Sequence, residues 1–163
     1  MVLSIIVILA VVALDQATKY LTLEYLTGVE TFPVIKDVLH LTYVENRGAA
    51  FGMLADHRAV FMVISTLGIA ALFVWLCVSK PKSAWMNLGI SFVIGGGIGN
   101  MIDRIARGFV VDMIDCRFID FYVFNVADSF VCIGCGMVFI ALIIEIVGER
   151  KTKKSTSGDV TDV

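Results

Sequence analysis

The chain has 163 residues, of which 58% are hydrophobic and 17% are charged, and its mean hydropathy is +0.89. Soluble domains usually carry about 45–50% apolar and about 25% charged residues, so the composition excludes a disordered chain and nearly excludes a soluble globule. The 13 basic and 15 acidic residues give a net charge of −2 and no polybasic face for nucleic acid. The composition therefore indicates a small integral membrane protein.

The first predicted membrane span covers residues 2–23. Its uninterrupted apolar part, Val2–Leu14, is short compared with the roughly 20 residues that a spanning helix needs, and polar residues follow it. A cleaved signal peptide is the competing interpretation, because residues 11–13 resemble a small-residue cleavage site. Such a peptide has a basic region at its start and this chain has none before Leu3, so we favour a span.

Three further stretches are long and apolar enough to cross a membrane, at residues 59–79, 84–102 and 126–147. The third span is rich in glycine and contains Gly95-x-x-x-Gly99, a spacing that lets membrane helices approach closely. We interpret these glycines as packing residues. The sequence thus predicts an all-α polytopic membrane protein with four transmembrane helices.

The connections between the spans are unequal. Residues 80–83 form a tight turn, whereas residues 24–58 are too many for a simple turn and predict structure of their own. Partial alternation over Val38–Val44 indicates a short strand in that loop. Residues 103–125 are dense in acids and in aromatics that suit a membrane interface. We expect one membrane-embedded domain over residues 1–148 and a disordered tail over residues 149–163.

Basic residues give the expected orientation. The turn and the tail hold six of them, as do the two long loops, so the raw count is a tie. The first group lies directly beside helix ends, where the positive-inside rule has most force. We therefore expect both termini in the cytoplasm and both long loops outside.

Histidine and cysteine usage argues against a metal or redox enzyme. The two histidines, His40 and His57, form no H-x-x-x-H pattern, so the usual ligands of a zinc hydrolase are missing. Cys132 and Cys135 form a C-x-x-C pair inside an apolar run without a second pair. We expect them to be small buried apolar side chains and expect no metal site.

The informative residues are polar groups at membrane depth. A carboxylate at a helix centre costs about 2.5–3.5 kcal/mol on insertion scales, so such a residue usually has a partner or a task. With the expected orientation, four segments bring polar residues to the outer boundary: Asp15, Lys19, Asn100, Asp103, Arg104, Asp112, Asp115, Asn125 and Asp128.

Several of these residues also have structural interpretations. Asp15 and Lys19 are four positions apart and can form an intrahelical ion pair. Asn100, Asp103 and Arg104 share a helix face on which an Asp–Arg contact can form.

Asn125 can cap the last span, and Asp128 can interact with the dipole of that helix. Asp115 and Asp120 flank a loop and suit a surface. These interpretations leave Asp112 and the clustering unexplained.

Carboxylates are the catalytic groups that the sequence offers most clearly. A serine nucleophile lacks a histidine base, Lys19 has no serine partner at an evident spacing, and the cysteines lack a base. Two aspartates held close cannot both ionise easily, so the pair can deprotonate a water and protonate a leaving amine. Spacing alone makes Asp112 and Asp128 plausible members of such a pair, and Asp103 and Asp115 are alternative members.

Five sequence blocks, in order, resemble those of lipoprotein signal peptidase, the signal peptidase II family. They cover residues 1–148 and together are highly specific: Asp15-Gln16-x-x-Lys19, Asn46-Arg47-Gly48-Ala49-Ala50-Phe51-Gly52, Gly99-Asn100-x-x-Asp103-Arg104, Val110-Val111-Asp112-x-x-Asp115 and Phe124-Asn125-Val126-Ala127-Asp128-Ser129.

The resemblance implies a plasma-membrane aspartic endopeptidase, without metal or nucleotide, that cuts bacterial prolipoproteins just before a diacylglyceryl-modified Cys. It implies inhibition by globomycin, a small extracytoplasmic β platform with a lid in the first loop, and contact with membrane phospholipids. A monomer suffices, since one chain carries the whole pair. Carried over by motif, the roles are catalytic for Asp112 and Asp128, substrate-binding for Asn46, Gly48, Asn100, Asp103, Arg104 and Asn125, and supporting for Asp15 and Lys19.

The chain departs from the family pattern at two positions. Tyr122 stands where the family often has Pro, which removes a fixed φ from that loop. Met113 replaces an aromatic residue and keeps the position apolar. Neither position is assigned to chemistry.

Two other classes remain as alternatives. A small ion-coupled transporter also has four spans with acidic residues, but it would need short loops and a carboxylate deep in the bundle. A non-enzymatic assembly factor is the second alternative. A presenilin-type protease is disfavoured, because its G-x-G-D pattern reads Gly97-Ile98-Gly99-Asn100 here.

Overall fold

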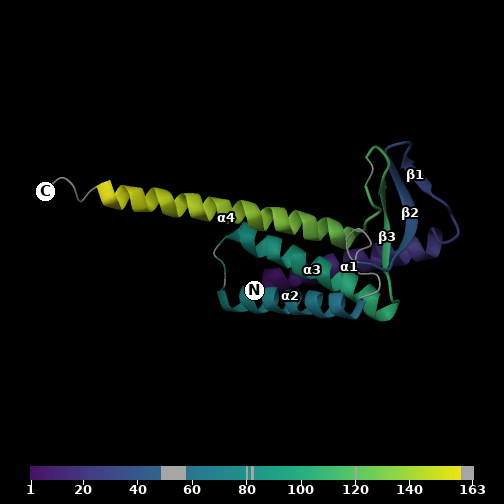
Figure 1. Ribbon diagram of the computed structural model, residues 1–163, viewed down its shortest axis with the longest axis horizontal. Coiled ribbons are helices and arrows are strands. Elements are labelled where there is room, and N and C mark those ends of the chain that lie inside the picture. Colours follow the sequence, from purple (N-terminus) through teal and green to yellow (C-terminus); the bar gives the residue numbers. More distant parts are fainter. Residues whose placement is uncertain (49–57, 80, 82, 120, 159–163) are drawn as a thin grey trace.

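The computed structural model describes residues 1–48, 58–79, 81, 83–119 and 121–158. Four helices run side by side along the long axis, and a small sheet lies across one end of them (Figure 1). The start of α1 and the end of α4 lie at the other end. In chain order the elements are α1 (Val2–Tyr25), β1 (Phe32–Ile35), β2 (Leu39–Asn46), α2 (Arg58–Ser79), α3 (Ala84–Ala106), β3 (Val110–Cys116) and α4 (Val126–Gly158).

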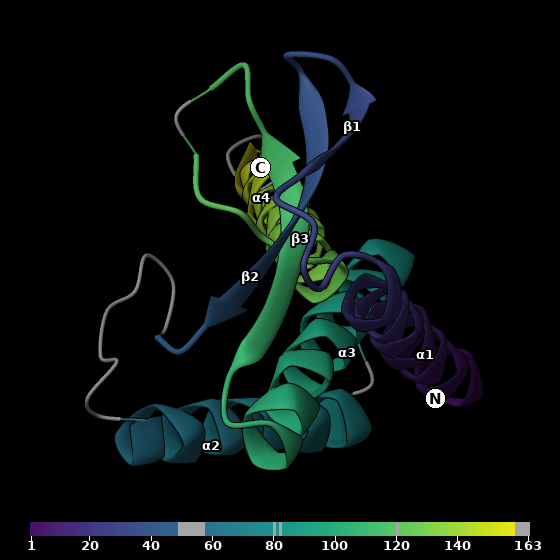
Figure 2. The ribbon, with the colours of Figure 1, turned by 90° about the vertical axis from the view of Figure 1, so that its right-hand side faces the viewer.

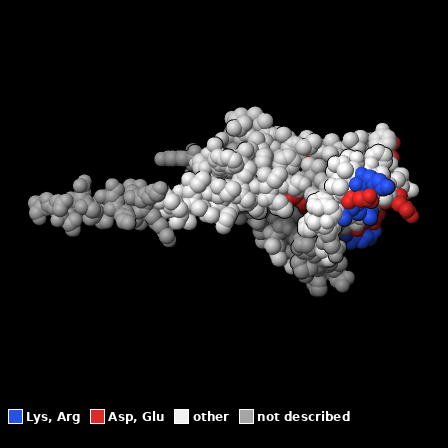
Figure 3. Space-filling model, turned by 90° about the horizontal axis from the view of Figure 1, so that it is seen from above, with Lys and Arg blue, Asp and Glu red and all other residues white. Residues whose placement is uncertain are grey.

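All four helices are long and apolar enough to cross a membrane, over Val2–Tyr25, Met62–Ser79, Ala84–Ala106 and Val126–Gly148. Their outward faces expose large apolar side chains, such as Leu67 at 65% and Phe139 at 65%. Water would disfavour such a surface and lipid would not. On the face seen in Figure 3, most of the visible charged side chains gather at the sheet end. The four predicted spans are confirmed.

α3 is the central helix, and its glycines set how closely its neighbours approach. A Cβ at Gly89 would lie 2.8 Å from the Gly134 carbonyl oxygen of α4, and one at Gly95 would lie 2.8 Å from Val11 Cβ of α1. At Gly96 it would meet the Ala127 carbonyl oxygen. The predicted packing role of these small residues is confirmed, because no larger side chain fits at these contacts.

The predicted small sheet is present, and it is antiparallel in the order β1-β2-β3. β2 overlaps the predicted strand at Val38–Val44. The third strand, β3, comes from the other long loop, between α3 and α4, so the sheet is not confined to the first loop. β3 escaped prediction because residues 110–113 are buried one after another and show no alternation of burial.

Two further details differ from expectation. α4 continues as helix to Gly158, into the segment 149–163 whose composition predicted disorder; residues 159–163 lie outside the described residues. Glu, Arg and Lys are good helix formers, which suits this continuation. Cys132 and Cys135 are exposed rather than buried, on the side of α4 that would face lipid. The segment Ala49–Gly52 of the second sequence block also lies outside the described residues.

Candidate active site

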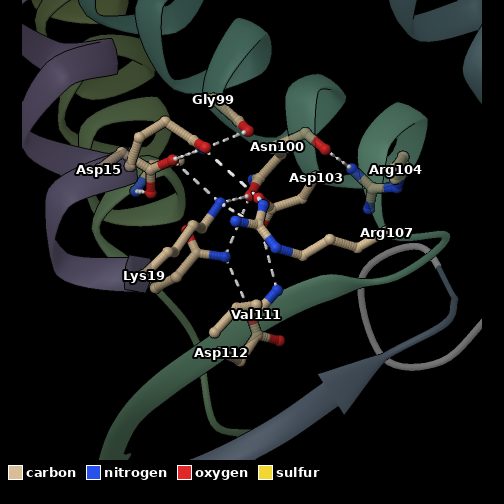
Figure 4. A network of polar contacts seen from close by, with 12 residues as sticks. Asp15, Lys19, Gly99, Asn100, Asp103, Arg104, Arg107, Val111 and Asp112 are labelled. Atoms are coloured by element: carbon tan, nitrogen blue, oxygen red, sulfur yellow. Dashed lines mark hydrogen bonds and ion pairs between the residues drawn. The ribbon is translucent and has the colours of Figure 1, made fainter. Parts of the chain in front are cut away.

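The polar residues of four elements meet where the sheet joins the helices. β3 brings Asp112 to the first turn of α4. Figure 4 shows Asp112 close to Asp15 and Lys19 of α1 and to the residues at the end of α3. Residues far apart in sequence thus form one network. All the residues predicted for the site lie in it or border it: Asp15, Lys19, Asn46, Gly48, Asn100, Asp103, Arg104, Asp112, Asn125 and Asp128.

Asn125 links the two aspartates of the predicted pair. Its side-chain amide donates to Asp112 Oδ1 at 2.6 Å, and its backbone N–H donates to Asp128 Oδ2 at 3.2 Å. The Asp128 N–H in turn donates to Asn125 Oδ1 at 2.9 Å. This exchange is a reciprocal cap between the N-cap and N3 positions of α4, so the predicted cap is confirmed. Asn125 is fully buried, and its position is therefore fixed relative to both carboxylates.

Asn100 of α3 adds a second amide to the pair. Its Nδ2 donates to Asp128 Oδ1 at 2.7 Å, while its Oδ1 accepts from Asn125 Nδ2 at 3.1 Å and from Lys19 Nζ at 2.9 Å. The ammonium can only donate, so it fixes which end of the Asn100 amide faces Asp128. Lys19 therefore orients Asn100 and, through it, Asp128.

β2 supplies the remaining amide. Asn46 Nδ2 donates to Asp112 Oδ2 at 2.9 Å, and Asn46 Oδ1 accepts from the Gly48 N–H at 3.1 Å. Arg104 reaches the same strand end, where its guanidinium donates to the Gly48 carbonyl oxygen at 3.3 Å and to the Asn100 carbonyl oxygen at 3.3 Å. Both oxygens of Asp112 thus accept from side-chain amides, one on each flanking element.

A buried ion network lies directly behind the pair. Lys19 Nζ is 2.9 Å from Asp15 Oδ2 and 3.0 Å from Asp103 Oδ2, and all three side chains are fully buried. The predicted Asp15–Lys19 ion pair is confirmed. Asp15 Oδ1 also accepts from the Ala127 N–H at 3.0 Å, and Asp103 Oδ2 accepts from the Val111 N–H at 3.0 Å. Through these two backbone N–H groups, the network fixes the positions of Val111 and Ala127, which directly precede Asp112 and Asp128.

Two members of this network, Gln16 and Arg107, were not among the predicted site residues. Arg107 Nη1 lies 2.6 Å from Asp103 Oδ1, so Arg107 pairs with an aspartate for which Arg104 was the expected partner. Gln16 donates to Asp15 at 3.1 Å and to the Gly99 carbonyl oxygen at 3.1 Å, joining α1 to α3. The spacing of Arg107, four residues after Asp103 on one helix, was the available signal.

Asp115, which the sequence offered as an alternative member of the catalytic pair, lies in a separate cluster of polar side chains. Its Oδ2 accepts from Thr42 Oγ1 at 2.8 Å and lies 2.7 Å from Arg117 Nε. Successive side chains of a strand point to opposite faces, and Asp112 and Asp115 are three positions apart on β3. Asp103, the other alternative, forms ion pairs with Lys19 and Arg107. The geometry thus favours Asp112 and Asp128.

Burial changes the acidity of Asp112. Loss of solvent raises the pKa of this carboxyl from 3.8 to about 6, and the negative charge of Asp128 acts in the same direction. The amides of Asn46 and Asn125 and the charge of Lys19 oppose this rise. A buried carboxyl with such a pKa can hold or release a proton near neutral pH.

The arrangement suits acid–base chemistry by two carboxyl groups. In the described part of the chain, no three His, Cys, Asp or Glu side chains are grouped so that they could hold a metal ion.

Comparison with known proteins identifies the family. A sequence model of signal peptidase (SPase) II matches residues 7–144, most of the chain. The chain belongs to the signal peptidase II family. Curated lipoprotein signal peptidases are similar over most of both chains. The proteins of Caldanaerobacter subterraneus subsp. tengcongensis and Halothermothrix orenii are each 45% identical, over 80% and 84% of this chain and 89% and 92% of their own length.

Solved structures agree with this signal peptidase II membership. Two structures described as bacterial membrane enzymes match with TM-scores of 0.82 and 0.80 at 34% and 35% identity. The first match covers 90% of both chains, and the second covers 87% of this chain and 93% of the other. The fold, with its four helices and end-on sheet, is therefore that of a known membrane enzyme.

Proposed function

We propose that this chain is a membrane aspartic endopeptidase that removes the signal peptide from diacylglyceryl-modified bacterial prolipoproteins, cutting just before the lipidated Cys. Asp112 and Asp128 are the catalytic pair. Membership of the signal peptidase II family supports the reaction and the substrate. The observation that carries the assignment of the pair is Asn125, which binds both carboxyl groups at once.

The pair works by sharing a proton. Two neighbouring carboxyl groups cannot both ionise easily, and the raised pKa of Asp112 is consistent with a proton held there. The ionised member takes a proton from water as the water oxygen attacks the scissile carbonyl carbon. The protonated member donates to the carbonyl oxygen, and a proton then passes to the leaving amine as the C–N bond breaks.

The supporting residues keep the pair in place while the substrate binds. Asn46, Asn100 and Asn125 donate to the carboxylate oxygens, and the family resemblance assigns them to the substrate site. Gly48 and Arg104 meet at the end of β2 beside the pair, whereas Asp103 is fully buried between Lys19 and Arg107 and supports the site from behind. Asp15 and Lys19 act from behind by orienting Asn100. Preorganised donors of this kind need no rearrangement when charge develops.

The helix ends bear on the proposed orientation in the membrane. The end of α2 and the end of α4 lie opposite the sheet, and the neighbouring sequence carries six basic residues. Together with the positive-inside rule, this supports a proposed orientation with both termini in the cytoplasm and the aspartate pair near the outer leaflet. There water reaches the pair while the acyl chains of the substrate stay in lipid. A monomer suffices, because one chain holds every residue of the site.

An ion-coupled transporter is not supported. The chain belongs to the signal peptidase II family and not to a transporter family. Its buried charges also lie beside a sheet rather than deep within the helices.

A gel-shift assay tests the proposal. Purified protein in detergent meets a lipidated prolipoprotein and, separately, the unmodified precursor, each with and without globomycin. We expect globomycin-sensitive cleavage of the lipidated form alone. Asp112→Asn and Asp128→Asn should each reduce cleavage by about 10²–10⁴-fold, the usual contribution of a positioned acid–base group.

Asp37→Asn is the matched control. Asp37 is exposed in the β1–β2 turn at a positive φ of 60°, where Asn is well tolerated. The control should cleave as the wild type does. Near wild-type cleavage by either Asp112→Asn or Asp128→Asn would remove that residue from the catalytic pair. Absence of cleavage by folded wild-type protein would overturn the reaction.

A further inference from the structure

The turn between α3 and β3 is held by one residue, Asp103. α3 ends at Ala106, and the Asp103 carbonyl oxygen accepts from the backbone N–H groups of Arg107 at 2.8 Å and Gly108 at 3.3 Å. Gly108 has a φ of 90°, a conformation that glycine adopts without strain at the end of a helix. The Asp103 carboxylate then accepts from the Val111 N–H of β3 at 3.0 Å. Asp103 therefore fixes both the end of the helix and the start of the strand.

The start of β3 determines where Asp112 lies. In the view onto the sheet end, β3 leaves the end of α3 and crosses in front of α4 (Figure 2). Val111 is fully buried and directly precedes Asp112. A change in the Asp103 carboxylate would therefore reach Asp112 through a single residue.

Arg107 determines how the Asp103 carboxylate is turned. Its Nη1 lies 2.6 Å from Asp103 Oδ1, and Gln16 donates to the same oxygen at 3.4 Å. The other oxygen, Oδ2, lies 3.0 Å from Lys19 Nζ and accepts from Val111. Figure 4 shows the Arg107 side chain reaching back from the end of α3 to Asp103. Charge-assisted hydrogen bonds of this kind are short and directional, so Arg107 keeps Oδ2 available for Lys19 and the strand.

Arg107 also balances the charge of the buried network. Asp15, Lys19 and Asp103 are fully buried, and two carboxylates with one ammonium leave one negative charge uncompensated. The Arg107 guanidinium, whose side chain is 29% exposed, cancels that charge. An uncompensated charge in a buried site is costly and acts on every ionisable group beside it. The neighbouring Asp112 is such a group.

We propose that Arg107 is a positioning residue for cleavage: acting through Asp103, it keeps the buried network neutral and holds Asp112 beside Asn125. Arg107 lies between the third and fourth sequence blocks, so the family resemblance assigns it no role. The inference rests on the proposed function of the aspartate pair.

The pH dependence of cleavage reports this role. The charged groups around Asp112 are Asp128 of α4, Asp15 and Lys19 of α1, and Asp103, Arg104 and Arg107 of α3, while β2 contributes the neutral amide of Asn46. Loss of the Arg107 charge leaves the network negative, and a negative charge opposes ionisation of a neighbouring carboxyl. The pKa of Asp112 should then rise further, so the acidic limb of kcat/KM should move to higher pH.

The test compares Arg107→Gln and Arg107→Lys with the wild type. Cleavage of the lipidated prolipoprotein is measured as a function of pH, and thermal melting gives the folded fraction of each protein. Arg117→Gln is the matched control. Arg117 also pairs with an aspartate, at 2.7 Å from Asp115, but this pair belongs to the separate polar cluster of the sheet.

We expect Arg107→Gln to lower kcat of the folded fraction about 3–10-fold with little change in KM, less than the loss of a positioned acid–base group costs. Its acidic limb should move up by roughly half a pH unit, less than a charge in direct contact would cause. Arg107→Lys keeps the charge and should restore the limb. Arg117→Gln should match the wild type in both properties.

Two results would overturn the proposal. Arg107→Gln could melt at a lower temperature while its folded fraction kept the wild-type kcat and acidic limb, and Arg107 would then only add stability. Arg107→Lys could keep the shifted limb of Arg107→Gln, and the charge would then not matter.

Carbon NMR of the carboxyl groups follows the acidity of Asp112 without cleavage, with the Asp112 signal identified by its loss in Asp112→Asn. Absence of cleavage by the wild type would overturn the proposed function alone. In that case, equal titration midpoints of Asp112 in the wild type and in Arg107→Gln would also overturn the role of Arg107. A higher midpoint in Arg107→Gln would support the role in charge balance. The two failures are therefore distinguishable.

Discussion

Asn125 and Asp128 cap each other at the first turn of α4, with N···O distances of 2.9 and 3.2 Å. The same Asn125 side chain donates to Asp112 at 2.6 Å. One residue thus begins the helix and joins the two aspartates, so the cap and the site are not alternatives.

Asn125→Ser separates these two roles. Serine caps a helix about as well as asparagine, so we expect the melting temperature in detergent to change little. Serine has no amide to reach both Asp112 and Asn100, so kcat should fall about 10-fold or more, the effect of roughly 1.4 kcal/mol of lost positioning. Asn125→Ala should lose both the helix cap and the amide bridge. Loss of the cap should lower the free energy of unfolding by about 0.5–2 kcal/mol.

Melting curves and single-turnover cleavage of the lipidated substrate measure the two effects separately. Full activity of Asn125→Ser would show that the amide bridge is dispensable.

The acidity of Asp112 gives a pH dependence of stability. A carboxyl whose pKa is raised from 3.8 to about 6 binds its proton more tightly in the folded protein. Its contribution to stability is therefore fully present below the unfolded pKa and is lost as pH rises through the folded pKa. The melting temperature of the wild type should fall more steeply between these two pH values than that of Asp112→Asn.

The comparison uses slopes, because Asp112→Asn also places an amide among the donors of Asn46 and Asn125 and changes stability at every pH. Parallel curves for the two proteins would contradict the raised pKa.

Much of the site could be predicted from sequence because its residues lie in short motifs. Asp15 and Lys19 are one helical turn apart, so their ion pair follows from spacing. The four spans follow from apolar length. Recognition of Asp112 and Asp128 as a pair depended on motif resemblance, since no local rule brings a strand residue to a helix start.

The remainder depends on tertiary contacts that local patterns do not encode. β3 pairs with β2 across more than sixty residues of chain, as in the Asn46–Val110 partners, and its buried residues hide the period of two. Asp103 could pair with either arginine on its helix, and only the folded arrangement puts Arg107 at 2.6 Å.

The buried network behind the pair should be mainly structural. Lys19→Met leaves the buried carboxylates of Asp15 and Asp103 without their ammonium, so we expect a loss of about 3–5 kcal/mol. Asp15→Asn should cost less, because Lys19 keeps Asp103 as a partner. Both variants should retain more activity per folded molecule than Asp112→Asn does.

Lys36→Met is the matched control, since Lys36 is exposed in the β1–β2 turn and should tolerate the change. Thermal melting is followed alongside turnover of the folded fraction. An Asp15→Asn variant that melts like the wild type but does not cleave would assign Asp15 to chemistry instead.

The close approach of α3 and α4 supports the site from within the membrane. A Cβ at Gly96 would meet the carbonyl oxygen of Ala127, the residue that precedes Asp128. Backbone cannot turn aside as a side chain can, so Gly96→Ala must move the start of α4, at a cost of about 1–3 kcal/mol typical of overpacking. The same movement displaces Asp128, so cleavage should fall together with the melting temperature.

Gly136→Ala is the control, because Gly136 is on α4 with no atom within 4 Å of an added Cβ. This substitution should be neutral or stabilise the helix by up to roughly 1 kcal/mol, since alanine favours helix more than glycine does. Melting temperature and cleavage rate are measured for both variants in the same detergent. If Gly96→Ala matched Gly136→Ala in both, the spacing of α3 and α4 would not determine the position of Asp128.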